Sequence, residues 1–150
     1  MRIEISTAIA APPEVVWPVL SSVASWPTWL PTVSRVDALD GNGLVVGARF
    51  RVTQPRLRPA VWVVTDVEGP LRFCWQSRAP GMLLVGDHVI ERSAGGASRV
   101  TLRLDFSGPV GVLAGWLYGS LSRSYVAREA EALKHAVETA VAQSAAGSAR

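Results

Sequence analysis

Histidine and cysteine, two side chains well suited to acid–base and nucleophilic chemistry, are scarce in this chain of 150 residues. His88 and His135 are the two histidines, and Cys74 is the single cysteine. A neutral imidazole offers one hydrogen-bond donor and one acceptor, and it exchanges protons near neutral pH. It can therefore orient a carbonyl or hydroxyl group, or act as a general acid or base. Of the two histidines, His88 is the candidate, because alternation places it on the same face as Leu84 and Ile90.

Other kinds of chemistry have little support in the sequence. Two histidines, with Cys74 predicted to face outward, do not make a set of zinc ligands. The chain lacks the Gly-Lys-Ser/Thr phosphate loop, the dinucleotide-binding glycine pattern and the Gly-x-Ser-x-Gly nucleophile elbow. We therefore expect no metal and no cofactor. His88 keeps two alternative roles, as a hydrogen-bonded core residue or as the polar group of a binding or catalytic site.

Composition and charge narrow the class of protein. The chain is 49% hydrophobic and 18% charged, with a formal net charge of +3, which is typical of a folded globular domain. The arginines between residues 49 and 58 form only a local basic cluster, so we expect no nucleic-acid partner. The single cysteine and the absence of a leader pattern favour a cytoplasmic protein. The most apolar stretch, 109–121, is shorter than the roughly 20 residues of a transmembrane helix.

Hydrophobic periodicity predicts the elements that would position His88. A period of two predicts strands at 3–9, 33–39, 48–52, 60–67, 71–77, 82–92 and 98–106. Prolines and capping residues predict two short helices between the first two strands. After Phe106 the period lengthens to about 3.6, which predicts a long helix to about Ala142. Runs of strands without crossover helices favour an antiparallel α+β domain over 1–143, followed by a disordered tail at 144–150.

The long helix has two apolar sides. One predicted stripe faces the sheet and consists of Val112, Val126, Ala130, Leu133, Val137 and Val141. Gly111, Gly115 and Gly119 recur on or near this side, although a glycine inside a helix costs about 1 kcal/mol relative to alanine. Close contact with the sheet and room for a ligand are the two alternative reasons. On the other side, Leu113, Leu117 and Leu121 would be covered by the first helices, a second copy in a homodimer, or a membrane surface.

Several short motifs, in this order, resemble the START-like or helix-grip superfamily in its SRPBCC (polyketide cyclase/dehydrase) branch. They are Ile-x-Ala-Pro-Pro-Glu-Val-Val-Trp at 9–17, Trp26-Pro27-Thr28-Trp29, Leu71-Arg72-Phe73-Cys74-Trp75, Gly86-Asp87-His88 and Phe106-Ser107-Gly108-Pro109-Val110-Gly111. The resemblance covers residues 1 to about 140. It implies a seven-stranded antiparallel curved sheet wrapped around a long C-terminal helix, with two short helices after the first strand. It also implies a deep cavity between the sheet and that helix for lipids, polyketides, hormones or other apolar ligands.

Strand parity, combined with this implied cavity, selects the ligand-binding residues. Phe73 and Trp75 share one face of their strand, and Leu102 and Leu104 share one face of theirs. Both faces of 60–67 are apolar, so parity alone leaves Trp62 and Val63 as alternatives. The expected ligand-binding set is Trp29, Phe50, Trp62, Phe73, Trp75, Leu84, His88, Ile90, Leu102, Leu104, Gly115, Trp116 and Gly119.

Three functions fit these residues. The first is binding or carriage of a small hydrophobic ligand, lipid-like, polyketide-like or aromatic, through apolar walls and a few polar groups. The second is a polyketide cyclase or dehydratase in which His88 is the catalytic general acid or base. The third is a module that docks on a protein or a membrane through Leu113, Leu117 and Leu121. The sequence does not decide between catalysis and binding.

Overall fold

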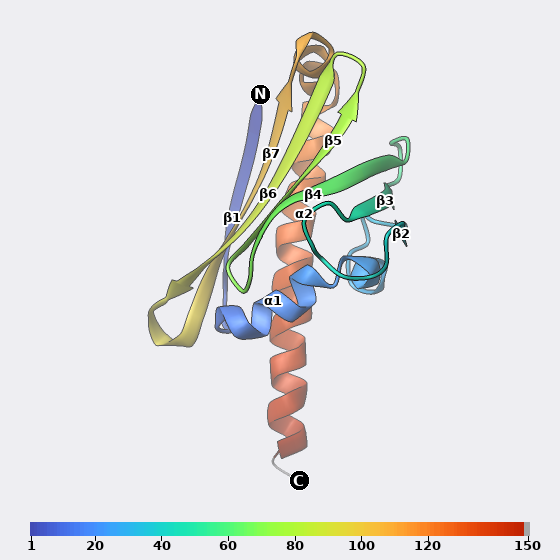
Figure 1. Cartoon of the computed structure of the whole chain (residues 1–150). Coiled ribbons are helices and arrows are strands. Elements are labelled where there is room, and N and C mark those ends of the chain that lie inside the picture. The colour runs from blue at the N-terminus through green and yellow to red at the C-terminus, as the bar shows by residue number, and fades with distance from the viewer. Residues whose placement is uncertain (149–150) are drawn as a thin grey trace.

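The structure, a computed structural model, describes residues 1–148. Figure 1 shows strands on one side of a long helix. The elements, in chain order, are β1 (Arg2–Ile9), α1 (Pro13–Ser21), the 3₁₀ helix η1 (Val23–Thr28), β2 (Arg35–Ala38), β3 (Arg49–Thr53), β4 (Ala60–Glu68), β5 (Arg72–Ala79), β6 (Met82–Ser93), the 3₁₀ turn η2 (Ala94–Gly96), β7 (Ala97–Ser107) and α2 (Pro109–Ser148). The seven predicted strands and the long C-terminal helix are confirmed.

All seven strands form one antiparallel sheet in the order β1-β7-β6-β5-β4-β3-β2. The sheet curves, and α2 packs against β1, β7 and β6 (Figure 1). The segment from β1 to β2 contains α1 and η1, and α1 packs against α2. This is the α+β helix-grip arrangement expected from the sequence. None of the helices in residues 1–148 is both long and apolar enough to cross a bilayer.

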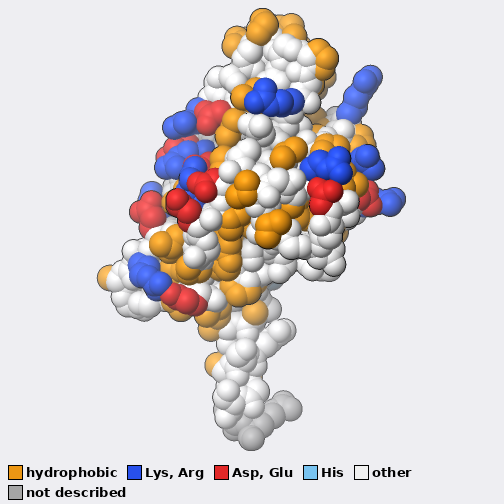
Figure 2. Space-filling view, viewed as in Figure 1, with side chains coloured by type: hydrophobic (Ala, Val, Ile, Leu, Met, Phe, Trp, Pro, Cys, Tyr) orange, Lys and Arg blue, Asp and Glu red, His pale blue; other side chains and the backbone are white. Residues whose placement is uncertain are grey.

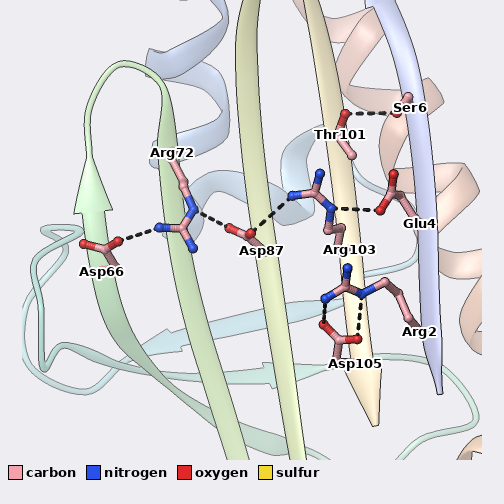
Figure 3. Close-up of polar contacts among 9 residues, drawn as sticks. All are labelled: Arg2, Glu4, Ser6, Asp66, Arg72, Asp87, Thr101, Arg103 and Asp105. Carbon is pink, nitrogen blue, oxygen red and sulfur yellow. Dashed lines mark hydrogen bonds and ion pairs between the residues drawn. The ribbon is translucent and has the colours of Figure 1, made fainter.

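Strand register sorts the side chains onto two faces of the sheet. Phe73 on β5 pairs with His88 on β6, which pairs with Leu102 on β7, and all three are buried on the face toward α2. On the opposite face, ion pairs join neighbouring strands (Figure 3). Cys74 lies in this outer row between Asp66 and Asp87, yet it is buried, and its burial raises the pKa of the thiol.

The predicted stripe of α2 is confirmed at Val126, Ala130, Leu133 and Val137, which are buried, and is wrong at its two ends. The buried residues of α2 are Gly111, Gly115, Ser122, Val126, Ala130, Leu133 and Val137. Val112 and Val141 are exposed, so their predicted place against the sheet is wrong. Val112 is one position, about 100° of rotation, away from the buried Gly111. The C-terminal end of α2 extends beyond the sheet (Figure 1), and Val141 belongs to the last turns of this helix.

The helix also continues farther than the pattern indicated. It runs to Ser148 instead of ending near Ala142, so residues 144–148 of the predicted disordered tail are helical, while 149 and 150 lie outside the described residues. Alanines at 142, 145 and 146 have the highest intrinsic helix propensity, which favours this continuation.

The α2 glycines let the helix lie close to the sheet. A Cβ at Gly111 would lie 3.4 Å from Met82 Cγ, and one at Gly119 would lie 2.8 Å from Met1 Cε. Gly115 contacts the same Met1 side chain. Of the two reasons weighed for these glycines, the structure therefore supports close contact.

Candidate functional site

His88 lies at the centre of a buried aromatic cluster. Strand β6 presents it toward α2 between β5 and β7, and only 5% of the residue is exposed. Its ring stacks on Phe73, with the ring centroids 4.1 Å apart and the planes 8° from parallel. Trp26 and Trp75 approach the same ring, with centroid distances of 5.8 and 5.7 Å. The walls around the imidazole are therefore apolar and aromatic, which is a common lining for a small-molecule site.

Glu129, on α2, is the acidic partner of His88. Its Oε1 atom lies 3.2 Å from His88 Nε2, and its side chain is 17% exposed. The two groups are close but not aligned as a hydrogen bond. Glu129 Oε1 and His88 Nδ1 are both buried and have no hydrogen-bond partner within residues 1–148. An unpartnered buried polar atom costs roughly 1–3 kcal/mol, so folding alone does not favour this arrangement. A molecule that carries a hydroxyl or carbonyl group could supply the missing hydrogen bonds.

Tryptophans connect this buried pair to the surface. Trp26 is anchored as a core residue, because its indole N–H donates to the Leu20 carbonyl at 2.9 Å. Trp29 contacts Trp26, and Trp62 contacts Trp75, with centroid distances of 6.1 and 5.2 Å. Both Trp29 and Trp62 are half-buried. Two aromatic paths therefore lead from partly exposed side chains to the His88 ring.

Gly86 allows Trp75 to lie flat over β6. The two residues are paired across β5 and β6, and a Cβ at Gly86 would lie 2.6 Å from Trp75 Nε1. Any side chain at this position would push the indole out of the cluster. In the sequence, Gly86 stands out only as part of the Gly86-Asp87-His88 motif. In the structure, it leaves room for the Trp75 indole.

The structure places most of the expected ligand-binding residues inside the domain. The buried ones are Phe50, Phe73, Trp75, His88, Ile90, Leu102 and Gly115. The half-buried ones are Trp29, Trp62, Leu84, Leu104 and Gly119. Of Trp62 and Val63, Trp62 is the one that faces the aromatic cluster, because it contacts Trp75.

Trp116 lies outside this interior, which corrects its expected position. Trp116 is 79% exposed, the largest exposed fraction among the exposed hydrophobic residues. The reason is the rotation of α2: Gly115 faces the sheet, so the next residue points about 100° away from it.

Sequence reasoning missed Glu129. A signal for it does exist, because Glu129 lies three residues after Val126 and four before Leu133, both of which are buried. That spacing places a carboxylate on the apolar side of a helix, where charged groups are rare unless they have a partner.

Two hollows of the described residues lie away from this pair. One hollow of about 710 Å³ lies along the exposed end of α2, from Glu131 to Ala146. A second, of about 490 Å³, lies between the α1–η1 segment and the loop at 42–44. Neither is lined by His88 or Glu129, and the space around these two residues is occupied by aromatic rings. Within residues 1–148, no three histidine, cysteine or acidic side chains are grouped so that they could hold a metal ion.

Comparisons with known proteins agree with this architecture. The profile of the family described as "Polyketide cyclase / dehydrase and lipid transport" matches residues 1–142. No curated protein sequence matches the chain. The solved Zhui aromatase/cyclase from Streptomyces sp. R1128 has a TM-score of 0.76 at 18% identity, covering 94% of this chain and 95% of that one.

Two further structures are similar. A protein from Thermus thermophilus has a TM-score of 0.72 at 22% identity, over 93% of this chain and 99% of its own. A START superfamily protein from Mycobacterium smegmatis has a TM-score of 0.68 at 17% identity, over 92% and 97%. Structural similarity at these identities shows a shared fold, while the family profile covers nearly the whole chain. The chain therefore belongs to the polyketide cyclase/dehydrase and lipid transport family and has a START-like helix-grip fold.

Proposed function

We propose that the protein binds a small, largely apolar molecule between its sheet and α2, and that His88 and Glu129 recognise a polar group of that molecule. The observation that carries the proposal is the pair of buried, unpartnered polar atoms, His88 Nδ1 and Glu129 Oε1, in an otherwise aromatic surround. Membership in a family described by polyketide cyclisation and lipid transport supports the same class of ligand. Apolar walls would supply affinity, and the two polar groups would set orientation.

Binding requires some interior side chains to move, because aromatic rings fill the space around His88. Trp29 and Trp62 are suited to this, since both are half-buried and each contacts the cluster from its rim. A ring of the ligand could take the place of Trp62 against Trp75 and so preserve the stacking contact. We therefore expect an aromatic or polycyclic ligand to bind more tightly than a flexible aliphatic one.

The proposal is tested with two probes that differ by one hydroxyl group, naphthalene and 2-naphthol, titrated by calorimetry or fluorescence. The parent protein should bind 2-naphthol about tenfold more tightly, because the hydroxyl hydrogen-bonds to the buried pair. The double variant His88→Leu/Glu129→Met should bind both probes with similar affinity. The matched control is His135→Leu/Glu131→Met, which changes an exposed histidine and glutamate of α2 and should keep the preference.

The stability of the same double variant separates a binding site from a structural ion pair. Removing two unpartnered polar groups should leave the free energy of unfolding within about 1 kcal/mol of the parent, or raise it. A clear loss of stability, together with an unchanged preference for 2-naphthol, would contradict the proposal. Separately, solvent extraction of natively purified protein, followed by mass spectrometry, would identify any natural ligand that co-purifies.

A second candidate function is acid–base catalysis on the bound molecule. It is favoured by the 3.2 Å approach of Glu129 Oε1 to His88 Nε2, because a carboxylate beside an imidazole can orient the ring and stabilise its protonated form. The similarity to an aromatase/cyclase fold supports the same direction. In such a reaction His88 would remove a proton from carbon next to a carbonyl group and return one to the product.

Deuterium exchange distinguishes catalysis from binding alone. With 1-tetralone in deuterated buffer, a catalytic His88 should accelerate exchange of the protons next to the carbonyl, measured by NMR. The acceleration should disappear in His88→Leu. Saturable 2-naphthol binding without accelerated exchange would leave the binding function and reject the catalytic one.

A further inference from the structure

The first turns of α2 carry an exposed apolar surface that the interior site does not use. We call it the apolar helix face; it consists of Val112, Leu113, Trp116 and Leu117, all exposed. Figure 2 shows hydrophobic side chains gathered at the top of the molecule, where α2 begins, with basic side chains nearby below them. Exposed apolar patches of this kind are uncommon on a soluble monomer and usually have a partner.

The spacing of these residues shows that they act as one surface. Residues 112, 113, 116 and 117 follow the i, i+1, i+4, i+5 pattern of a single helix face. Tyr118 is also exposed but points about 100° away from Leu117, on the side of Gly111. The opposite side of the same turns is held against the sheet by Gly111 and Gly115. No charged residue occurs from Pro109 to Ser122, so this face is uninterrupted.

The charges around the apolar helix face are positive. Arg123 follows the apolar helix face on α2. Arg78 lies near the end of β5, beside the β5–β6 hairpin. This hairpin is held next to the start of α2, because the Val110 N–H donates to the Gly81 carbonyl at 2.9 Å. Both arginines are exposed, and neither forms a salt bridge within the described residues. The chain has no acidic residue between Asp105 and Glu129.

We propose that the apolar helix face docks on an anionic phospholipid membrane. Val112, Leu113 and Leu117 would enter the acyl region, and Trp116 would lie at the level of the headgroups. Arg78 and Arg123 would attract acidic lipids. A second copy fits less well, because a two-fold contact through this face would bring the same unpaired arginines together. The proposal goes beyond ligand binding and does not rest on it, since none of these residues contributes to the His88–Glu129 pair.

The test is co-sedimentation of the full chain with vesicles of phosphatidylcholine alone and of phosphatidylcholine mixed with phosphatidylserine. The parent should bind the mixed vesicles more tightly than the neutral ones. Trp116→Ser/Leu117→Ser should weaken binding about tenfold, and Arg78→Gln/Arg123→Gln should remove the preference for phosphatidylserine. The matched control is Val45→Ser/Val46→Ser, which removes two equally exposed apolar side chains from the loop before β3 and should bind like the parent.

Further measurements test the docking independently. Phospholipids with brominated acyl chains should quench tryptophan fluorescence of the parent, and Trp116→Phe should lose most of that quenching. His88→Leu/Glu129→Met should bind vesicles like the parent, which separates docking from ligand binding. A dimer in light scattering that is dispersed by Trp116→Ser/Leu117→Ser, without binding to either vesicle, would overturn the proposal in favour of a second copy. Equal vesicle binding by the parent and Trp116→Ser/Leu117→Ser would also overturn it.

Discussion

At the residue scale, the interior combines close aromatic packing with polar atoms that lack partners. Phe73, Trp75 and Trp26 surround the His88 ring at centroid distances of 4.1, 5.7 and 5.8 Å, yet His88 Nδ1 has no hydrogen bond. Packing of this quality normally accompanies satisfied polar groups, because an unpaired group in a low-dielectric surround is costly. We interpret this combination through the proposed ligand, whose polar group would supply the missing hydrogen bond.

Gly86→Ala tests how closely this interior is packed. The new methyl group would lie 2.6 Å from Trp75 Nε1, and the indole is held by Trp26, Trp62 and Phe73, so it cannot move without disturbing three other rings. We expect the free energy of unfolding to fall by about 1–3 kcal/mol, measured by denaturant titration.

Gly43→Ala is the control for this substitution. Its nearest neighbour would be Val45 Cγ1 at 4.0 Å, so its effect should stay within about 0.5 kcal/mol. Equal effects of the two substitutions would show that Trp75 is loosely held and that the interior is not close-packed.

At the element scale, α2 is attached to the end of β1 by polar contacts as well as by packing. Lys134 Nζ donates to the Ala8 carbonyl at 2.7 Å, and the Ala10 N–H donates to Glu138 Oε2 at 3.1 Å. Lys134 and Glu138 also pair with each other at 2.8 Å. These contacts set the position of the helix along the sheet, and therefore the height at which Glu129 meets His88.

This attachment should depend on pH. The hydrogen bond from Lys134, and then the one from the Ala10 N–H, lower the pKa of Glu138 below its usual value. A lowered folded-state pKa contributes stability above the unfolded value, which is lost as pH falls through the folded value. The difference in unfolding free energy between the parent and Glu138→Gln should therefore be present at neutral pH and shrink below about pH 4.

Glu131→Gln is the matched control, because Glu131 is exposed on the same helix and forms no salt bridge within the described residues. It should show little difference from the parent at any pH. A Glu138→Gln difference that is constant from neutral to acidic pH would show that the carboxylate charge does not contribute to the attachment.

At the scale of the whole molecule, an ion-pair network spans the outer face of the sheet (Figure 3). Asp66 on β4, Arg72 on β5, Asp87 on β6, Arg103 on β7 and Glu4 on β1 form successive pairs. The hydrogen bond to Asp87 is the main reason that the pKa of Arg72 is raised. The network links β1 to the four consecutive strands β4 to β7, on the face opposite the candidate site.

Asp87→Asn should weaken this network at its centre, since Asp87 pairs with both Arg72 and Arg103 and its side chain is only 17% exposed. We expect the free energy of unfolding to fall by about 1 kcal/mol, and the difference to shrink in about 1 M salt. Asp37→Asn is the control, because Asp37 pairs only with Arg35 on its own strand and its loss should have a smaller effect. A salt-independent loss would attribute the effect to packing rather than charge.

The sequence by itself determined the elements and their order. Alternation of apolar and polar residues is local, so it predicted seven strands and the face on which His88 lies, and the change to a period of about 3.6 predicted α2. Turn residues and the family resemblance supplied the helix-grip arrangement, which the structure confirms. The end of α2 was misplaced because alanine-rich segments remain helical without an apolar stripe to mark them.

Only the tertiary structure decided the composition of the candidate site. Residues 88 and 129 meet because α2 has one particular rotation and height on the sheet, and helical spacing alone sets neither of these. The same rotation turns Trp116 outward and the buried glycines inward. Periodicity gives the direction of a side chain but not the volume left between two elements, so only the packed structure shows aromatic rings filling the space around His88.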